Sequence, residues 1–372
     1  MIEKIELKNF KIHEDLDLPL GMLTILTGQN GMGKSSLIQS LLLLRQSFYQ
    51  YSDIRGINLK GDLVSLGTAK DVECQSSQET ELTINLHHSD KDKFEFNFSY
   101  DVLDPYDTFL PSETSIEKYL LETCPLFNNN FQYISASRFG PQKGYDRDTD
   151  VVQQNKQLSK IAGQCEYAIH FLHYFGKKIH CLPELVVGEN TEDTLGEQVD
   201  KWMQKISPRI KVNISQEGAD FKLNYKFTRQ DKPITEEMSA INVGFGISYV
   251  LPVLISILSA KPGALLLIEN PEAHIHPRAQ AELMKLVMRA TKAGIQIIME
   301  THSDHIVNGA LAAIAEDMEM YPLVKMYYFE RDDKNHTSKP LPLLINEDGR
   351  ISDAPEGFFD QIDIDLKRIM GF

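Results

Sequence analysis

The feature that most constrains this chain is a glycine-rich loop between two apolar runs. Residues 28–35 read Gly-Gln-Asn-Gly-Met-Gly-Lys-Ser. This GxxxxGK[ST] spacing arises by chance in a chain of 372 residues with odds of roughly one in a hundred. Residues 23–26 before the loop are apolar and strand-like, and residues 36–42 after it are helix-like. A strand–loop–helix order is the context in which such a loop binds the phosphates of a nucleotide.

The residue types of the loop explain this chemistry. Glycines allow the backbone to curl until successive N–H groups point at the phosphates, at the positive end of the following helix. Lys34 is expected to reach the β- and γ-phosphate oxygens, and the Ser35 hydroxyl to ligate Mg²⁺. We therefore predict ATP and Mg²⁺ as ligands, held by Gly28, Asn30, Gly31, Gly33, Lys34, Ser35 and Ser36.

A carboxylate follows a second apolar run. Residues 264–268 are continuously apolar, are preceded by Pro262-Gly263, and lead into Glu269. Such a run predicts an interior parallel strand. A carboxylate at the carboxyl end of that strand faces the ligand crevice of an open α/β sheet, so Glu269 is predicted to belong to the metal shell.

Two further segments carry weaker signals. Residues 295–299 predict another buried strand, and His302 in the turn after it would lie within reach of a γ-phosphate. A lone histidine at a strand end is more often structural, but its place one strand after the acidic strand favours a functional role. Gly244 and Gly246 precede an apolar helix at 249–260, where free N–H groups can meet an anion; alone, this pattern is also typical of an ordinary helix start.

Together and in this order, these segments resemble the RecF/SMC-like branch of ABC-type ATPases, and within it the ATPase module of the OLD (overcoming lysogenization defect) family. The matching segments are 5–11 and 28–36 (first strands and Walker A), 133–141 (a strand with an arginine turn), 243–252 (signature helix), 265–277 (Walker B and D-loop) and 299–308 (switch histidine). Residues 356–360 resemble a small uncharacterised domain often appended to bacterial members.

The resemblance implies a homodimer in which two heads sandwich two ATP molecules. It assigns Lys34 and Ser35 to phosphate and Mg²⁺, Glu269 to the metal shell and His302 to the γ-phosphate. Each Walker A loop would face the partner's signature helix. The signature residues Gly244, Gly246 and Ser248 would therefore contact the nucleotide of the second subunit.

The chain departs from that family in its catalytic carboxylate. The usual pair at the end of the Walker B strand is acid–acid, and here the second position is Asn270. An amide can orient a water molecule but cannot accept its proton. Glu272 is the nearest replacement. We therefore predict slow hydrolysis, or a site that a partner completes, with Glu269, Asn270, Glu272 and His302 as the catalytic candidates.

The second departure is the missing nuclease. OLD nucleases continue into a TOPRIM metal-nuclease domain, and this chain ends about a hundred residues after Glu269. Carboxylates at 360, 363 and 365 lie in or near an amphipathic helix predicted at 359–370, where a solvated acidic face is expected. His274 and His276 are assigned to D-loop structure. We expect the effector, such as a nuclease, on another polypeptide.

The predicted fold is α/β: a P-loop NTPase of ABC-ATPase head type, with a central mostly parallel sheet, a flanking antiparallel sheet and a helical insertion. Period-two patterns at 81–86 and 94–98 predict the antiparallel strands, and helices are expected at 162–175 and 195–206. Strand–helix alternation over 209–372 predicts a parallel sheet. The predicted units are 1–100 (N-terminal lobe), 101–208 (mixed, helical insertion), 209–330 (C-terminal lobe) and 331–372 (small extension). The insertion has no sustained heptads, so no coiled-coil arm is expected.

Composition narrows the partners and the compartment. Acidic residues outnumber basic ones 53 to 38, a net charge of −15, which argues against non-specific duplex DNA binding by the whole surface; a local basic strip stays open. The apolar stretch at 247–268 is broken at 261–263, too short on either side to span a membrane. With no secretory signal and four widely separated cysteines, we expect a cytoplasmic protein.

The functional prediction is an ATP-binding, slowly hydrolysing subunit that dimerises around ATP. It would gate or sense for a separate effector, in bacterial anti-phage defence. Two alternatives stay open: a non-hydrolysing, ATP-dependent interaction switch or scaffold, and a RecF-like DNA repair clamp.

Overall fold

The fold was derived from a computed structural model of the chain. It describes residues 1–51, 54–89, 93–101, 104–112, 116–189, 191–228, 234–355, 357–359 and 361–370, and of 361–364 the backbone alone.

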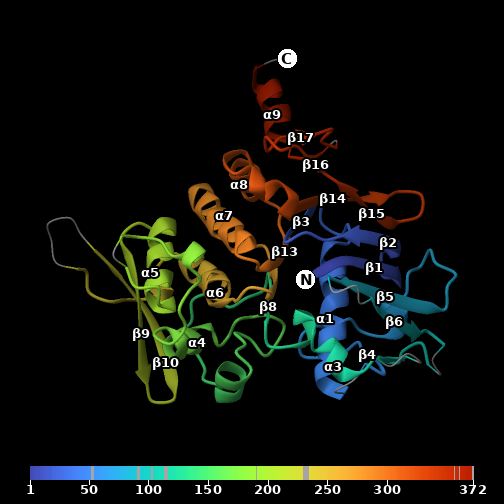
Figure 1. Cartoon of the computed structure of the whole chain (residues 1–372), viewed down its shortest axis with the longest axis horizontal. Helices are drawn as coiled ribbons and strands as arrows, with labels where there is room; N and C mark the ends of the chain where they lie inside the picture. Colours follow the sequence, from blue (N-terminus) through green and yellow to red (C-terminus); the bar gives the residue numbers. More distant parts are fainter. Residues whose placement is uncertain are drawn as a thin grey trace.

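A six-stranded sheet forms the centre of the molecule (Figure 1). Its order is β15-β14-β3-β13-β12-β8, and neighbouring strands run parallel except for the β14–β15 pair. This confirms the mostly parallel central sheet. The strands are β3 (Leu23–Gly28), β8 (Phe131–Ile134), β12 (Leu265–Glu269), β13 (Gln296–Glu300), β14 (Val324–Asp332) and β15 (Thr337–Pro342).

Side chains of the central strands alternate between two hydrophobic cores. Leu265 and Leu267 of β12 pack into the core of the N-terminal lobe, whereas Leu266 and Ile268 pack into the core on the opposite face. Successive side chains of a strand point to opposite faces, so a continuously apolar run is what a strand covered on both faces requires.

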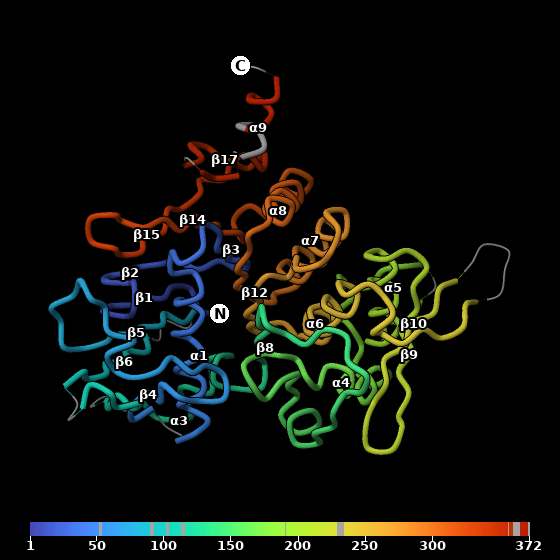
Figure 2. Tube along the Cα trace, turned by 180° about the vertical axis from the view of Figure 1, so that it is seen from behind, coloured from blue at the N-terminus to red at the C-terminus, as the bar shows by residue number. Residues whose placement is uncertain are grey.

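The N-terminal lobe covers one face with an antiparallel sheet. Its order is β2-β1-β5-β6, which confirms the strands expected from the period-two patterns. The helix α1 (Lys34–Tyr51) lies between this sheet and the central one (Figures 1 and 2). The elements of the lobe are β1 (Ile2–Phe10), β2 (His13–Pro19), β4 (Gly56–Asn58), α2 (Ala69–Val72), β5 (Glu81–His88), β6 (Lys93–Ser99), β7 (Phe109–Pro111) and α3 (Lys118–Leu121).

Helices and a small outer sheet cover the other face. Figure 1 shows α6, α7 and α5 between the central sheet and the β9–β10 ribbon. The elements are α4 (Ala168–Phe175), α5 (Leu195–Ile206), β9 (Ile210–Glu217), β10 (Asp220–Phe227), β11 (Met238–Ser239), α6 (Phe245–Ser259), α7 (Pro277–Lys292) and α8 (Asp304–Glu316). Within the described residues, none of the helices is both long and apolar enough to cross a bilayer.

The C-terminal segment projects from the body. It contains β16 (Leu344–Ile345), β17 (Ile351–Ser352) and α9 (Gln361–Met370), and Figures 1 and 2 show α9 far from the central sheet. Of the predicted acidic face, Asp365 lies on the exposed part of α9. Asp360 and the side chain of Asp363 lie outside the described residues, as does Glu356 of the resemblance at 356–360.

Three expectations need correction. The helix predicted at 162–175 begins only at residue 168, because Ala162, Gly163 and Cys165 have positive φ angles that interrupt a right-handed helix. The strands β9, β10 and β11 pair antiparallel, so the alternation after residue 209 does not build one parallel sheet. The central sheet also takes β8 from the predicted insertion, and the predicted boundary at 330/331 falls inside β14.

Candidate functional site

The phosphate loop connects β3 to α1 and is held by the β14–β15 hairpin. Gly28 has a φ of 127°, and a Cβ there would overlap the backbone carbonyl of Phe329. Gly33 has a φ of 102°, and its Cβ would come within 2.7 Å of the Ser338 hydroxyl, which itself donates to the Met32 carbonyl at 2.6 Å. Both positions therefore require glycine for steric and conformational reasons.

The loop borders a cavity of about 280 Å³. Predicted residues that line it are Asn30, Gly31, Gly33, Lys34, Ser35 and Ser36, and the structure adds Lys11, Ile12, Gln39 and Glu300. Lys11, which the sequence reasoning missed, donates to the Gln39 side chain at 2.7 Å. The cavity thus presents two lysines beside backbone N–H groups at the start of α1, a setting suited to an anion.

Lys34 is folded over the loop. Its Nζ donates to the carbonyls of Gly28 and Gln29 at 2.9 and 2.7 Å, and lies 3.9 Å from Glu300 Oε1. Burial lowers the pKa of Lys34, and the nearby Glu300 carboxylate opposes that shift.

Ser35 donates its hydroxyl to Glu300, the last residue of β13. Ser35 Oγ lies 2.8 Å from Oε2 and 3.1 Å from Oε1, and Glu300 is only 6% exposed. Burial raises the pKa of Glu300, while the Ser35 hydrogen bond opposes the rise. Sequence reasoning missed this carboxylate, although it ends a buried strand just as Glu269 does.

Glu269 ends β12, as expected, but its carboxylate is held from the β8 side. Tyr133 donates its hydroxyl to Oε1 and Ala136 its backbone N–H to Oε2, each at 3.0 Å. Burial raises the pKa of Glu269, and these two hydrogen bonds partly offset the rise.

Arg138, in the turn after β8, joins three segments of the site. Its Nε donates to the carbonyl of Tyr249 in α6 at 2.8 Å. The two remaining nitrogens donate to carbonyls of Ser135, Glu269 and Asn270 at 2.9–3.0 Å. With 2% exposure, its guanidinium is an internal brace, and its burial lowers its pKa.

Asn270 and Glu272 lie in the turn after β12. Asn270 has a φ of 43°, a left-handed conformation that asparagine adopts more readily than glutamate. Glu272 Oε1 accepts the His302 backbone N–H at 2.9 Å, and Oε2 is buried without a hydrogen-bond partner. Burial raises the pKa of Glu272, which brings a carboxyl group nearer the range of a general base.

His302 follows β13 and is accessible. Its side chain is 37% exposed, and Nε2 lies 4.0 Å from Glu300 Oε1. Partial burial and the positive charge of Lys34 lower the pKa of His302. The structure therefore brings His302, Glu300, Ser35 and Lys34 together at the mouth of the phosphate loop.

The predicted signature residues differ in their surroundings. Gly244 is the N-cap of α6, is exposed, and would leave an added Cβ with no atom within 4 Å. Gly246 is buried, and a Cβ there would overlap the His274 carbonyl of the predicted D-loop. Ser248 is 5% exposed and hydrogen-bonded with the Tyr225 hydroxyl at 3.1 Å. Ser248 therefore faces the core, whereas Gly244 lies on the surface, and the nucleotide contact expected of Ser248 stays a prediction.

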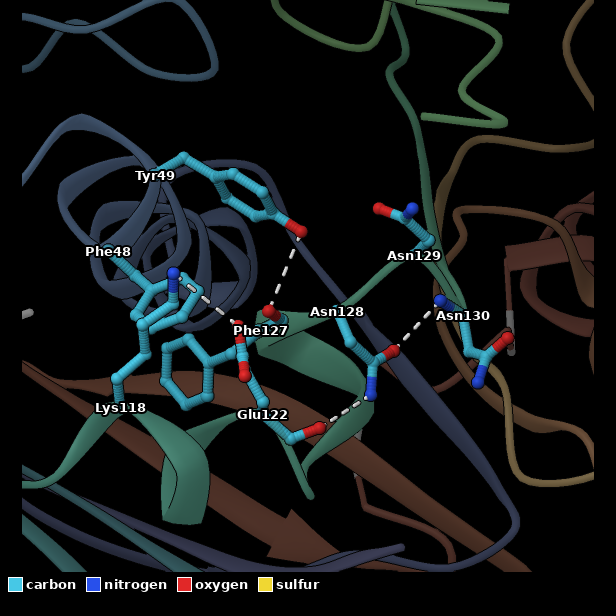
Figure 3. Close-up of a pocket in the computed structure, with 8 residues that line it drawn as sticks. All are labelled: Phe48, Tyr49, Lys118, Glu122, Phe127, Asn128, Asn129 and Asn130. Carbon is cyan, nitrogen blue, oxygen red and sulfur yellow. Dashed lines mark hydrogen bonds and ion pairs between the residues drawn. The ribbon is translucent and has the colours of Figure 1, made fainter. Parts of the chain in front are cut away.

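A larger cavity of about 560 Å³ lies beside the C-terminal half of α1 (Figure 3). There Asn128 Nδ2 donates to the Glu122 carbonyl at 2.9 Å, and Asn130 donates its N–H to the Asn128 side chain at 2.8 Å. The Asn128 side-chain amide thus bonds to the local backbone at both ends, and the phosphate loop lies at the opposite end of α1. The cavity is therefore separate from the site.

Comparisons with known proteins agree with this geometry. The family model described as "AAA domain, putative AbiEii toxin, Type IV TA system" matches residues 23–308, and one described as "Protein of unknown function (DUF3696)" matches 323–369. An OLD nuclease of Thermus scotoductus is 32% identical over 73 residues, which are 20% of this chain and only 13% of that protein. An ATP/GTP phosphatase of Helicobacter pylori is 21% identical over 360 residues, 90% of this chain and 94% of the relative.

Solved structures show the fold. An Smc head bound to the C-winged helix domain of ScpA is similar with a TM-score of 0.52 at 16% identity, covering 92% of this chain and 98% of that one. An Smc head with an extended coiled coil, bound to the C-terminal domain of ScpA derived from Pyrococcus furiosus, gives 0.51 at 13% identity and 99% of both chains. With a matched segment that spans most of its length, the chain belongs to this AAA domain family, as an ATPase with the ABC-type head fold of OLD-, RecF- and SMC-like proteins.

Proposed function

We propose that the chain binds ATP with Mg²⁺ in the phosphate-loop cavity, dimerises around the nucleotide and hydrolyses it slowly to gate an effector on another polypeptide. The observation that carries the proposal is that the phosphate-loop cavity and the exposed N-terminus of α6 lie apart in one chain. The cavity is lined by the phosphate loop and its neighbours, and among the described residues that line it none belongs to α6.

The donors around the cavity fit Mg²⁺. A hydroxyl and carboxylates are the hard oxygen ligands that this ion prefers, together with water and nucleotide phosphates. Ser35 would hold the ion together with one strand-end carboxylate, that of Glu269 or that of Glu300. When bound, the ion neutralises charge on the phosphates. Lys34 would exchange the loop carbonyls of Gly28 and Gln29 for phosphate oxygens.

The exposed start of α6 supports the homodimer. Gly244 presents the N-terminus of a 15-residue helix to solvent, and the positive end of a helix favours an anion. Because this end does not line its own chain's cavity, it is available to a nucleotide held by a second copy. Phe245 and Ile241 beside it are 48% and 46% exposed, which provides apolar area for the same contact.

The turn after β12 supports slow hydrolysis. Asn270 stands where a catalytic carboxylate is expected, and its amide can orient a water but not take its proton. Glu272 would act as the general base, because its Oε2 has no hydrogen-bond partner among the described residues. His302 would contact the γ-phosphate.

The biological setting rests on the relatives. One is called an OLD nuclease and the matching family is described with toxin–antitoxin systems. These descriptions support a role in anti-phage defence with a separate effector. The four free cysteines suit a reducing compartment such as the cytoplasm. Asn270 also favours a second candidate function, a non-hydrolysing switch that ATP closes.

Steady-state ATP turnover of the purified chain, with Lys34→Ala as the blank, separates these two functions. Slow turnover that is lost in Lys34→Ala and in Glu272→Gln supports the ATPase with Glu272 as base. ATP binding without turnover would favour the switch. No ATP binding at all would contradict both.

The homodimer has its own test, sedimentation with and without ATP and Mg²⁺. Gly244→Asp places a preferred N-cap residue on α6 and so keeps or increases stability, yet its carboxylate repels a partner's phosphates. We expect the ATP-dependent dimer to disappear in Gly244→Asp while Gly244→Ala keeps it. A wild-type chain that stays monomeric at saturating ATP would contradict the dimer.

A further inference from the structure

The Ser35 hydroxyl, which is predicted to bind Mg²⁺, is hydrogen-bonded to the carboxylate of Glu300, a residue outside the Walker B segment. Ser35 Oγ donates to both oxygens of Glu300, at 2.8 and 3.1 Å. We propose that Glu300, at the end of β13, is the carboxylate that faces the Mg²⁺ ion beside Ser35, and that Glu269 supports the turn behind it. This inference rests on the proposed binding of ATP with Mg²⁺.

Strand order brings Glu300 next to the phosphate loop. In the sheet, β13 lies directly beside β3, and Glu300 pairs with Leu26, two residues before Gly28. The strand β12 lies one position further away, and there Glu269 pairs with Glu300. Figure 1 shows β13 between β3 and the α6–α7 side of the sheet. Because parallel strands end at one edge of the sheet, the neighbouring strand supplies the carboxylate closest to the loop.

The hydrogen bonds of the other two carboxylates point elsewhere. Glu269 accepts one bond at each oxygen, from Tyr133 and from Ala136. Glu272 accepts the backbone N–H of His302. Glu300 is the one of these three carboxylates that is bonded to a phosphate-loop side chain and that lines the cavity.

The surroundings of Glu300 call for a cation that arrives with the nucleotide. The carboxylate is buried, with Lys34 Nζ at 3.9 Å and His302 Nε2 at 4.0 Å. Lys34 would turn to the phosphates when ATP binds, and Glu300 would then face negative charge. Within the described part of the chain, no three His, Cys, Asp or Glu side chains form a metal site by themselves. A divalent ion held by Ser35, Glu300, water and phosphate oxygens would balance the charge of Glu300 against the phosphates. It also needs no cluster of three protein ligands, because Mg²⁺ takes few ligands from the protein.

The experiment uses Mn²⁺ in place of Mg²⁺, with a non-hydrolysable ATP analogue. Electron paramagnetic resonance measures the free Mn²⁺, and the binding of the analogue is measured separately with and without metal. The proteins are the wild type, Glu300→Gln, Glu300→Asp, Lys34→Ala and the matched controls Glu269→Gln and Glu272→Gln. Thermal unfolding identifies the variants that keep the fold.

We expect Glu300→Gln to weaken Mn²⁺ binding in the ternary complex at least tenfold. Without metal it should bind the analogue as tightly as the wild type or more tightly, because a buried negative charge near the phosphates is gone. Glu269→Gln and Glu272→Gln should hold Mn²⁺ within about threefold of the wild type. If Glu300→Gln does not fold, Glu300→Asp carries the test, with weaker Mn²⁺ binding and unchanged metal-free binding.

Two results would overturn the inference. One is wild-type Mn²⁺ affinity in Glu300→Gln with loss in Glu269→Gln. The other is equal weakening of analogue binding with and without metal in Glu300→Gln, which indicates a structural role alone. Failure of the proposed function would look different: the wild type would not bind the analogue, or Lys34→Ala would bind it equally well.

Discussion

Arg138 connects three segments of the site through hydrogen bonds to backbone carbonyls. Substituting this arginine tests whether it stabilises the fold or binds phosphate. Its guanidinium donates four hydrogen bonds to backbone carbonyls of three segments: the turn after β8, the end of β12 and the first turns of α6. Its Cζ also lies 4.2 Å from the centre of the Tyr249 ring. Arg138→Met keeps much of the apolar stem and removes all four donors.

The expected loss of stability follows from those four bonds. A hydrogen bond involving a charged group contributes about 1.5–3 kcal/mol, so the gross loss is about 6–12 kcal/mol. Burying the guanidinium costs several kcal/mol, which the methionine no longer incurs. The net decrease in the free energy of unfolding is therefore about 3–5 kcal/mol, among the larger effects of single substitutions.

Urea unfolding followed by tryptophan fluorescence measures this loss. Trp202 is the single tryptophan, and it is buried in the same core as Val250 and Leu251 of α6. At a slope of about 3 kcal/mol per M, the midpoint should fall by about 1–1.7 M. Arg147→Met, an exposed arginine in the same segment, should change stability by less than about 0.5 kcal/mol. A loss below about 1 kcal/mol in Arg138→Met, with ATP affinity sharply reduced, would refute the brace and favour a phosphate contact.

Three further substitutions probe other parts of the structure. Gly246→Ala should lower the thermal midpoint and abolish the proposed ATP-dependent dimer, because its Cβ would overlap the His274 carbonyl; an unchanged midpoint would contradict that packing. Ser338→Ala removes the hydroxyl that donates to Met32 at 2.6 Å, a loss of about 1 kcal/mol that should weaken binding of a fluorescent ATP analogue a few-fold. Burial raises the pKa of Asp200 to about 6 from 3.8; the folded chain then holds a proton that the unfolded chain releases, and stability falls as pH rises from about 4 to 6. Replacement by asparagine should therefore stabilise the fold by about 1–3 kcal/mol at pH 8 and by less at pH 4.5 in urea titrations, and an equal gain at both pH values would show an ordinary pKa.

Much of the fold could be predicted because its signals are local. The phosphate loop, the apolar runs that became β12 and β13, and the amphipathic α5 are each encoded within about a dozen residues. The start of α4 was missed because positive φ angles at Ala162 and Cys165 have no distinctive residue type. The edge position of β8 depends on pairing with β12, more than 130 residues away, and no local pattern reports such a pairing.

In the functional site, too, local signals could be read from the sequence, whereas contacts between distant segments could not. The strand-end rule that selected Glu269 applies equally to Glu300, yet the polar residues after 300 drew the prediction to His302. What the rule could not supply was the strand order, since a carboxylate at the end of β13 lies nearer to Ser35 only because β13 lies beside β3. The surroundings of Ser248 also depend on a distant contact. Its side chain is buried beside Tyr225 of β10, and the sequences of these two segments carry no common signal that reports the contact.

The β14–β15 hairpin contacts the phosphate loop more closely than its place late in the chain suggests. β14 pairs with the whole of β3, from Val324 opposite Leu23 to Phe329 opposite Gly28. Ser338 of β15 then contacts the phosphate loop directly. The second family match, which starts at residue 323, therefore begins with the strand that completes the loop's support. A change in the position of the β14–β15 hairpin would be transmitted to Gly28 and Gly33 without any intervening element.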